Sequence, residues 1–157
     1  MQITIQRKEE QASGQFNGGE ILENKPIGFP QDGGPQVPYS NLFYWAHAWT
    51  DVGSLIGKHP HQGFEIMSIV LEGDIVHYDS KNDSWFPLKK GDVQIIRSGS
   101  GISHAEQMNK DSQKDDFALI SETDLVTVEA AVASRLLLIT SPEKLDYKPY
   151  LELYRRR

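Results

Sequence analysis

Short apolar runs separated by glycines and prolines are the feature that most constrains the fold of this chain. Thirteen glycines and eight prolines divide its 157 residues, and no helical periodicity continues for more than a few turns. Apolar runs bounded by such residues are typical of strands. The sequence therefore predicts an all-β chain with strands at residues 3–6, 42–49, 64–71, 75–78, 93–96, 103–108, 117–120, 126–132 and 135–140.

The length of the chain favours one domain over residues 1–157, because 157 residues can close one hydrophobic core but hardly two. Residues 24–40 contain four prolines and the pair Gly33-Gly34, so we expect a long surface loop there. Residues 141–157 are expected to form a C-terminal extension of the same domain.

The composition excludes several classes of function. The net charge is −6 and the sequence pI is about 5.3, which argues against direct binding to nucleic acid or to an anionic membrane. The first residues, MQITIQRKEE, lack a signal-peptide pattern, and no apolar run is long enough for a membrane span, so we expect a soluble cytoplasmic protein. There is no cysteine, so nitrogen and oxygen atoms must hold any metal ion.

The segment KHPHQGFE, residues 58–65, contains two histidines at alternate positions. Side chains two residues apart in a strand point to the same face, so His59 and His61 should converge. The segment GISHAE repeats this spacing with His104 and Glu106. Three imidazole nitrogens and one carboxylate oxygen from two strands predict a mononuclear metal site.

Other residues offer alternatives to this ligand set. The side chain of Glu65 points to the same face as His59 and His61 if one strand runs straight through residues 59–65. Gly63, however, favours a bulge that would turn Glu65 to the other face. His47 and His77 are each isolated in apolar runs, and we interpret both as ordinary strand histidines rather than ligands.

Nitrogen and oxygen ligands of this kind suit several divalent metals. Iron(II) is the first choice, because availability in the cell sets occupancy more than intrinsic affinity does, and manganese, nickel, copper and zinc are the alternatives.

The segments GSLIGKHPHQGFE, residues 53–65, and GDVQIIRSGSGISHAE, residues 91–106, resemble the pirin family of the cupin superfamily. The resemblance implies a double-stranded β-helix, the cupin jelly-roll barrel, with iron bound by His59, His61, His104 and Glu106. The chain differs from typical pirins in two ways. It has the length of a single-cupin member, and it has Gln62 where the family commonly has arginine.

The resemblance also implies two functions. The first is a flavonol dioxygenase of the quercetin 2,3-dioxygenase type, in which Glu106 is the catalytic base. The aromatic residues Phe43, Tyr44, Trp45 and Trp49 are candidates to line a pocket for a small planar substrate, and core packing is the alternative for them. The alternative is a non-catalytic regulator whose metal state controls contact with a protein partner. A third hypothesis gives the metal a purely structural role.

A single small barrel leaves sheet edges open, and open edges favour pairing with another chain. We therefore predict a homodimer that pairs through residues 135–140 and 147–154.

Overall fold

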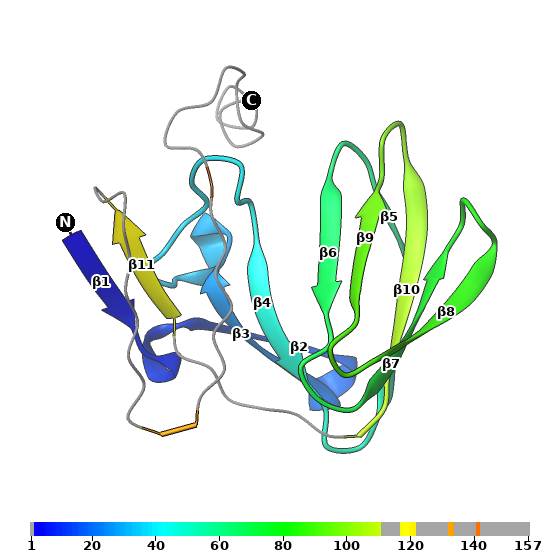
Figure 1. Cartoon of the computed structure of the whole chain (residues 1–157), viewed down its shortest axis with the longest axis horizontal. Helices are drawn as coiled ribbons and strands as arrows, with labels where there is room; N and C mark the ends of the chain where they lie inside the picture. Colours follow the sequence, from blue (N-terminus) through cyan, green and yellow to red (C-terminus); the bar gives the residue numbers. More distant parts are fainter. Residues whose placement is uncertain (1, 111–116, 122–131, 134–140, 142–157) are drawn as a thin grey trace. The chain divides into compact units, whose positions relative to one another are not determined.

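The computed structural model describes residues 2–110, 117–121, 132–133 and 141. In this part of the chain it contains eleven strands, three short 3-10 helices and no α-helix (Figure 1), which confirms the all-β prediction. The strands are β1 (Gln2–Gln6), β2 (Ala12–Phe16), β3 (Ile21–Ile27), β4 (Trp45–Trp49), β5 (Ser54–His61), β6 (Glu65–Ile69), β7 (Asp74–Asp79), β8 (Ser84–Lys89), β9 (Val93–Arg97), β10 (Ile102–Met108) and β11 (Phe117–Ser121). The 3-10 helices are η1 (Lys8–Glu10), η2 (Asn17–Gly19) and η3 (Pro30–Asp32).

The strands form four sheets among the described residues. Their orders are β1-β11, β2-β3-β4, β5-β10-β7-β8 and β6-β9. Seven strands lie where the sequence predicts them, namely β1, β4, β6, β7, β9, β10 and β11. The predicted strands at 126–132 and 135–140 lie outside the described residues, apart from Val132.

The prediction of a continuous loop at residues 24–40 is wrong at its start. Strand β3 runs to Ile27, and helix η3 begins at Pro30. Both Ile21 and Ile27 are fully buried, so burial of apolar side chains extends the strand past Pro26, which stands next to its end. The remaining stretch, residues 33–40, contains no strand and closes with a bridge between Tyr39 and Leu42.

The chain divides into two compact units. One comprises residues 13–23 and 47–114 and contains strands β5 to β10; we call it the β5–β10 unit. The other comprises residues 1–12, 24–46 and 115–157. The organisation of residues 1–157 as one cupin domain stays a prediction, and the proposed extension lies, beyond Ser141, outside the described residues.

Within the β5–β10 unit, β10 is the strand that places the candidate ligands, because it pairs antiparallel with β5 on one side and with β7 on the other. The buried apolar residues of this unit include Val70, Ile96, Ile102 and Ala105. Among the described residues, no helix has the length and hydropathy that a membrane span requires.

Candidate metal centre

The pairing of β5 with β10 brings the two predicted histidine segments together. His104 lies directly opposite His59, and Ile102 lies opposite His61. Directly opposed residues of an antiparallel pair have Cβ atoms about 5 Å apart on one face of the sheet. Two segments separated by more than forty residues of sequence therefore present His59, His61 and His104 to one point.

The three imidazoles meet through their Nε2 atoms. Nε2 of His104 lies 2.7 Å from Nε2 of His59 and 2.9 Å from Nε2 of His61. His104 is 2% exposed, whereas His59 and His61 are half-buried, so the cluster opens to solvent on the side of β5. The prediction that the histidines of the two segments share one site agrees with this geometry.

A bulge in β5 sets the orientation of His59. The register shifts between His104, opposite His59, and Glu106, opposite Ile56, so Gly57 and Lys58 together face the single residue Ala105. Nδ1 of His59 lies 2.9 Å from the carbonyl oxygen of Gly57. A carbonyl only accepts, so Nδ1 carries the proton and Nε2 presents a lone pair to the cluster.

The electrostatics of the cluster favour neutral imidazoles. Burial is the largest cause that lowers the pKa of His104 to about 3, and the neighbouring His59, His61 and His77 contribute to the same shift. Burial, with a contribution from His59, also lowers the pKa of His61. Neutral imidazoles are the form that binds metal ions, so both rings are ready to ligate at neutral pH.

Glu106 lies on a different side of His104 from the other two rings. Its Oε1 is 3.7 Å from Nδ1 of His104 and 3.6 Å from Nε2 of His77. Two groups of mutually close ligand atoms result: His59, His61 and His104 form one, and His77, His104 and Glu106 form the other. The predicted fourth ligand thus stands beside the ring of His104 and not with the three Nε2 atoms.

The alternative ligand Glu65 is excluded by its position. Strand β5 ends at His61, Gly63 adopts a left-handed backbone with φ of 74°, and Glu65 begins β6 in the other sheet. Its Oε1 accepts a hydrogen bond of 2.7 Å from Nε of Arg97, and the side chain is 62% exposed. The turn at Gly63 therefore separates Glu65 from the histidines.

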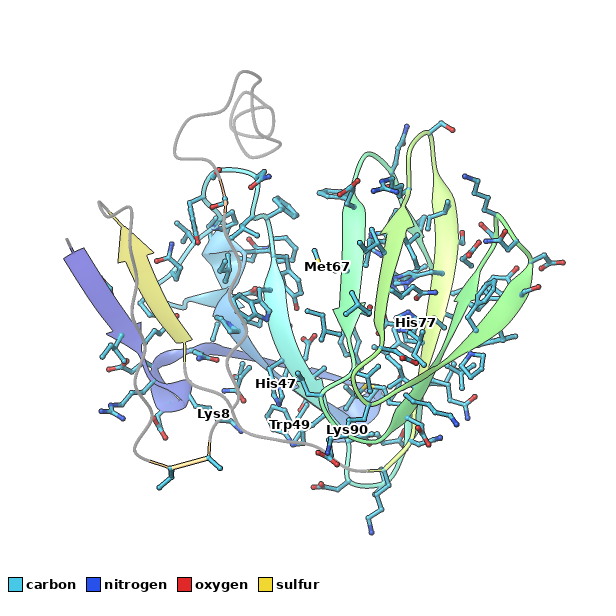
Figure 2. All side chains as sticks on the ribbon, viewed as in Figure 1. Lys8, His47, Trp49, Met67, His77 and Lys90 are labelled. Carbon is cyan, nitrogen blue, oxygen red and sulfur yellow. The ribbon has the colours of Figure 1, made fainter. Side chains whose placement is uncertain are left out.

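His77 is the residue of the site that the sequence prediction missed. It lies directly opposite Glu106 in the pairing of β7 with β10, and it is fully buried. Figure 2 shows its side chain among the strands of the β5–β10 unit. A single histidine in an apolar run gives no spacing signal; the antiparallel register of β7 and β10 would have revealed it. His47, interpreted in the same way, is outside both groups.

Asp79 stands opposite His104 on β7 but is used by a turn. Its Oδ1 accepts hydrogen bonds of 2.8 Å from the backbone N–H groups of Lys81 and Asn82. Burial would raise the pKa of Asp79, but these bonds and one from the side chain of Asn82 outweigh it and lower the pKa. This carboxylate therefore stabilises the turn between β7 and β8.

The three Nε2 atoms fit a bound transition-metal ion. Nitrogen ligands at about 2.1 Å from one ion and at right angles to each other are about 3 Å apart, close to the separations in the cluster. The donor set of neutral imidazoles with a carboxylate nearby suits divalent iron, nickel, copper, zinc or manganese. The residues present thus fit the metal that the sequence predicts.

A hollow of about 520 Å³ lies next to this cluster. It is lined by Pro60, His61, Gln62, Ser80, Gly101, Ile102 and Ser103. The aromatic residues 43–45 and Trp49, expected near a substrate, do not line it: Phe43 and Tyr44 pack against Phe29 in the other unit. The hollow therefore meets the cluster at His61, and its lining combines polar residues with Pro60 and Ile102.

Comparison with known proteins shows which family this chain resembles. Residues 36–120 match the family model described as Pirin. A quercetin 2,3-dioxygenase of Escherichia coli strain K12 is 39% identical over 56 residues, which are 36% of this chain and 24% of that protein. Pirin-like protein 2 of Arabidopsis thaliana is 43% identical over 56 residues, which are 36% of this chain and 17% of that protein.

Two solved structures resemble the fold. The crystal structure of YhhW from Escherichia coli has a TM-score of 0.59 and 24% identity, covering 80% of this chain and 59% of that one. The bacterial pirin YhhW of the same organism in complex with nickel(II) has a TM-score of 0.59 and 26% identity, covering 68% of this chain and 45% of that one. These likenesses confirm the predicted cupin fold.

The chain covers less than two thirds of the length of each of these relatives. The family model, however, matches more than half of this chain and spans His59, His61, His104 and Glu106. The chain belongs to the pirin family.

Proposed function

We propose that this chain binds one divalent transition-metal ion through His59, His61 and His104 and oxygenates a flavonol-type substrate. The observation that carries the proposal is the convergence of three Nε2 atoms from β5 and β10, with separations of 2.7 and 2.9 Å at His104. Iron(II) is the first choice of metal, and nickel(II) is supported by the metal that the Escherichia coli pirin structure contains.

The chemistry proposed for the site has two parts. A bound ion supplies a Lewis acid that binds and polarises a substrate oxygen. The residues of the chain hold the substrate and its proton: a flat ring would enter the hollow beside His61, and Glu106, beside the ring of His104, would accept the proton of the substrate hydroxyl. The side chain of Glu106 is 24% exposed, so it is partly screened from water.

The substrate class is supported by the name of the Escherichia coli relative, a quercetin 2,3-dioxygenase. Because the aligned part is a quarter or less of that protein, the activity is a proposal for this chain.

Metal analysis and oxygen uptake test the proposal together. We expect one equivalent of metal in protein reconstituted with iron(II), and quercetin-dependent oxygen consumption by the loaded protein. The double variant His59→Ala, His104→Ala should lose both. The matched control is His47→Ala, which removes a histidine outside the site and should retain both.

Each half of the proposal can fail separately. Wild-type protein that takes up no metal would contradict the site itself. Metal binding without quercetin turnover would reject the oxygenase and favour the regulator, whose capture of a protein partner should then depend on His59.

A further inference from the structure

Two ring nitrogens on the side of His104 that faces Glu106 are buried and make no hydrogen bond among the described residues. They are Nδ1 of His104 and Nε2 of His77. Both rings are almost completely buried, at 2% and 0% exposure. A buried polar atom without a partner costs on the order of 1–3 kcal/mol, so each one in a native protein calls for a physical explanation.

Both nitrogens face the same carboxylate. Oε1 of Glu106 is 3.6 Å from Nε2 of His77 and 3.7 Å from Nδ1 of His104. These separations are just beyond hydrogen-bond length, and a carboxylate oxygen that comes closer can accept one N–H from each ring.

The other nitrogen of His77 decides which form the ring takes. Nδ1 of His77 lies 2.5 Å from Oε1 of Gln94 on β9, a contact that joins the two sheets of the β5–β10 unit. The two ends of an amide have the same shape. With the oxygen toward His77, Nδ1 donates and Nε2 turns a lone pair toward the Glu106 carboxylate, which is repulsive. With the NH₂ toward His77, Nδ1 accepts and Nε2–H points at Glu106.

We propose that Gln94 and His77 form a hydrogen-bonded relay that positions Glu106 beside the ring of His104. In the relay the Gln94 amide is reversed, so that its NH₂ donates to Nδ1 of His77, and Nε2–H of His77 donates to Glu106. His77 is thus a positioning residue: it acts on the metal centre through Glu106 and contacts none of the three Nε2 atoms. The inference rests on the proposed metal centre.

The geometry favours a relay over a second metal ion between His77, His104 and Glu106. An ion there and an ion held by the three Nε2 atoms would share the ring of His104 through both nitrogens, which requires that ring to lose its remaining proton. The relay satisfies the same three atoms with the protons that neutral imidazoles already carry.

Cobalt(II) binding tests the relay, since its visible absorption bands report ligand geometry as well as affinity. We expect His77→Leu to weaken Co²⁺ binding by about 10- to 100-fold, the usual cost of losing an outer-shell partner, and to alter the bands. Gln94→Leu should act in the same direction. His77→Gln retains an N–H near the position of Nε2 and should restore most of the affinity, and His47→Leu, the matched control, should bind as wild type does.

A double-mutant cycle separates positioning from general destabilisation. In a Glu106→Gln background, His77→Leu should cost little further affinity, because the group that it positions has already changed. Thermal unfolding of each variant accompanies the titration. If His77→Leu does not fold, Gln94→Leu carries the same cycle, because Gln94 is only half-buried.

Three results would overturn the relay while leaving the metal centre intact. These are an equal loss from His77→Leu in both backgrounds, no loss at all, and a second equivalent of Co²⁺ in wild type that His77→Leu removes. Failure of wild type to bind any Co²⁺ would overturn the proposed function and the relay together.

Discussion

His104 combines two properties that rarely occur together in a core residue. It is 2% exposed, and both of its ring nitrogens face other titratable groups. The protein tolerates this because its imidazole stays neutral: burial, with a contribution from the neighbouring histidines, lowers its pKa to about 3, far below the ordinary value of 6.5. Because the folded protein holds this imidazole neutral, the free energy of unfolding decreases when the pH falls far enough to protonate it in the unfolded chain.

The metal-free protein should therefore lose stability as the pH falls. A histidine with a lowered folded-state pKa contributes stability that is present above the unfolded value of 6.5 and is lost as the pH falls toward about 3. Between pH 6.5 and 5 we expect the free energy of unfolding to drop by about 2 kcal/mol on account of His104. Urea unfolding of chelator-treated protein measures this.

The control for this prediction is His104→Gln, which cannot titrate in the same range. Its free energy of unfolding should change less between pH 6.5 and 5 than that of wild type. Equal slopes in the two proteins would show that His104 is not the group responsible.

The alternation of side chains along a strand was sufficient to predict His59, His61 and His104 from sequence, because it depends only on neighbouring residues. His77 and Gln94 could not be predicted in this way. Each is a single polar residue in its own run, and each acquires its role only when β7 pairs with β10 and β9 approaches from the second sheet. Glu65 was an open alternative for the same reason, since its facing depends on the turn at Gly63.

At the scale of elements, β5 shows why the predicted strands do not include residues 54–61, although the alternation of His59 and His61 already implied extended backbone there. Its sequence SLIGKHPH contains Gly57 and Pro60, and both weaken a strand prediction. In the order β5-β10-β7-β8, however, β5 is an edge, where a proline without N–H disrupts no ladder. The same holds for β8, which contains Pro87 and lies at the opposite edge.

The glycines of this strand should respond differently to alanine. Gly53 precedes β5 with φ of 82°, and an added Cβ would stand 3.3 Å from the carbonyl oxygen of Met108. We expect Gly53→Ala to lower the free energy of unfolding by about 1–2 kcal/mol. Gly57, at the bulge, has no atom within 4 Å of its Cβ position, so Gly57→Ala should cost less.

Urea unfolding of the two variants provides the comparison, and each serves as control for the other. The account of β5 would be contradicted if Gly57→Ala were the more damaging change. Metal binding by Gly57→Ala should persist, because the carbonyl oxygen that orients His59 is retained.

At the scale of the whole molecule, metal binding should be linked to folding. An ion that binds the folded chain alone stabilises it by about 2.7 kcal/mol when its concentration is 100 times the dissociation constant. We expect iron(II) or nickel(II) to raise the unfolding midpoint and a chelator to reverse the rise. The double variant His59→Ala, His104→Ala should show no shift; an equal shift would place the ion elsewhere.

The all-β class of the chain was predictable from its glycines and prolines, and the cupin fold was predictable from two motifs. The predicted homodimer was argued from open sheet edges, and its pairing segments, residues 135–140 and 147–154, lie outside the described residues. It stays a prediction that light scattering of the purified chain can decide.

The most direct test of the metal centre is anomalous diffraction from crystals of the metal-loaded protein. We predict one strong anomalous peak within about 2.1 Å of the Nε2 atoms of His59, His61 and His104. A peak at another place, or no peak at these three nitrogens in protein that contains metal, would contradict the account.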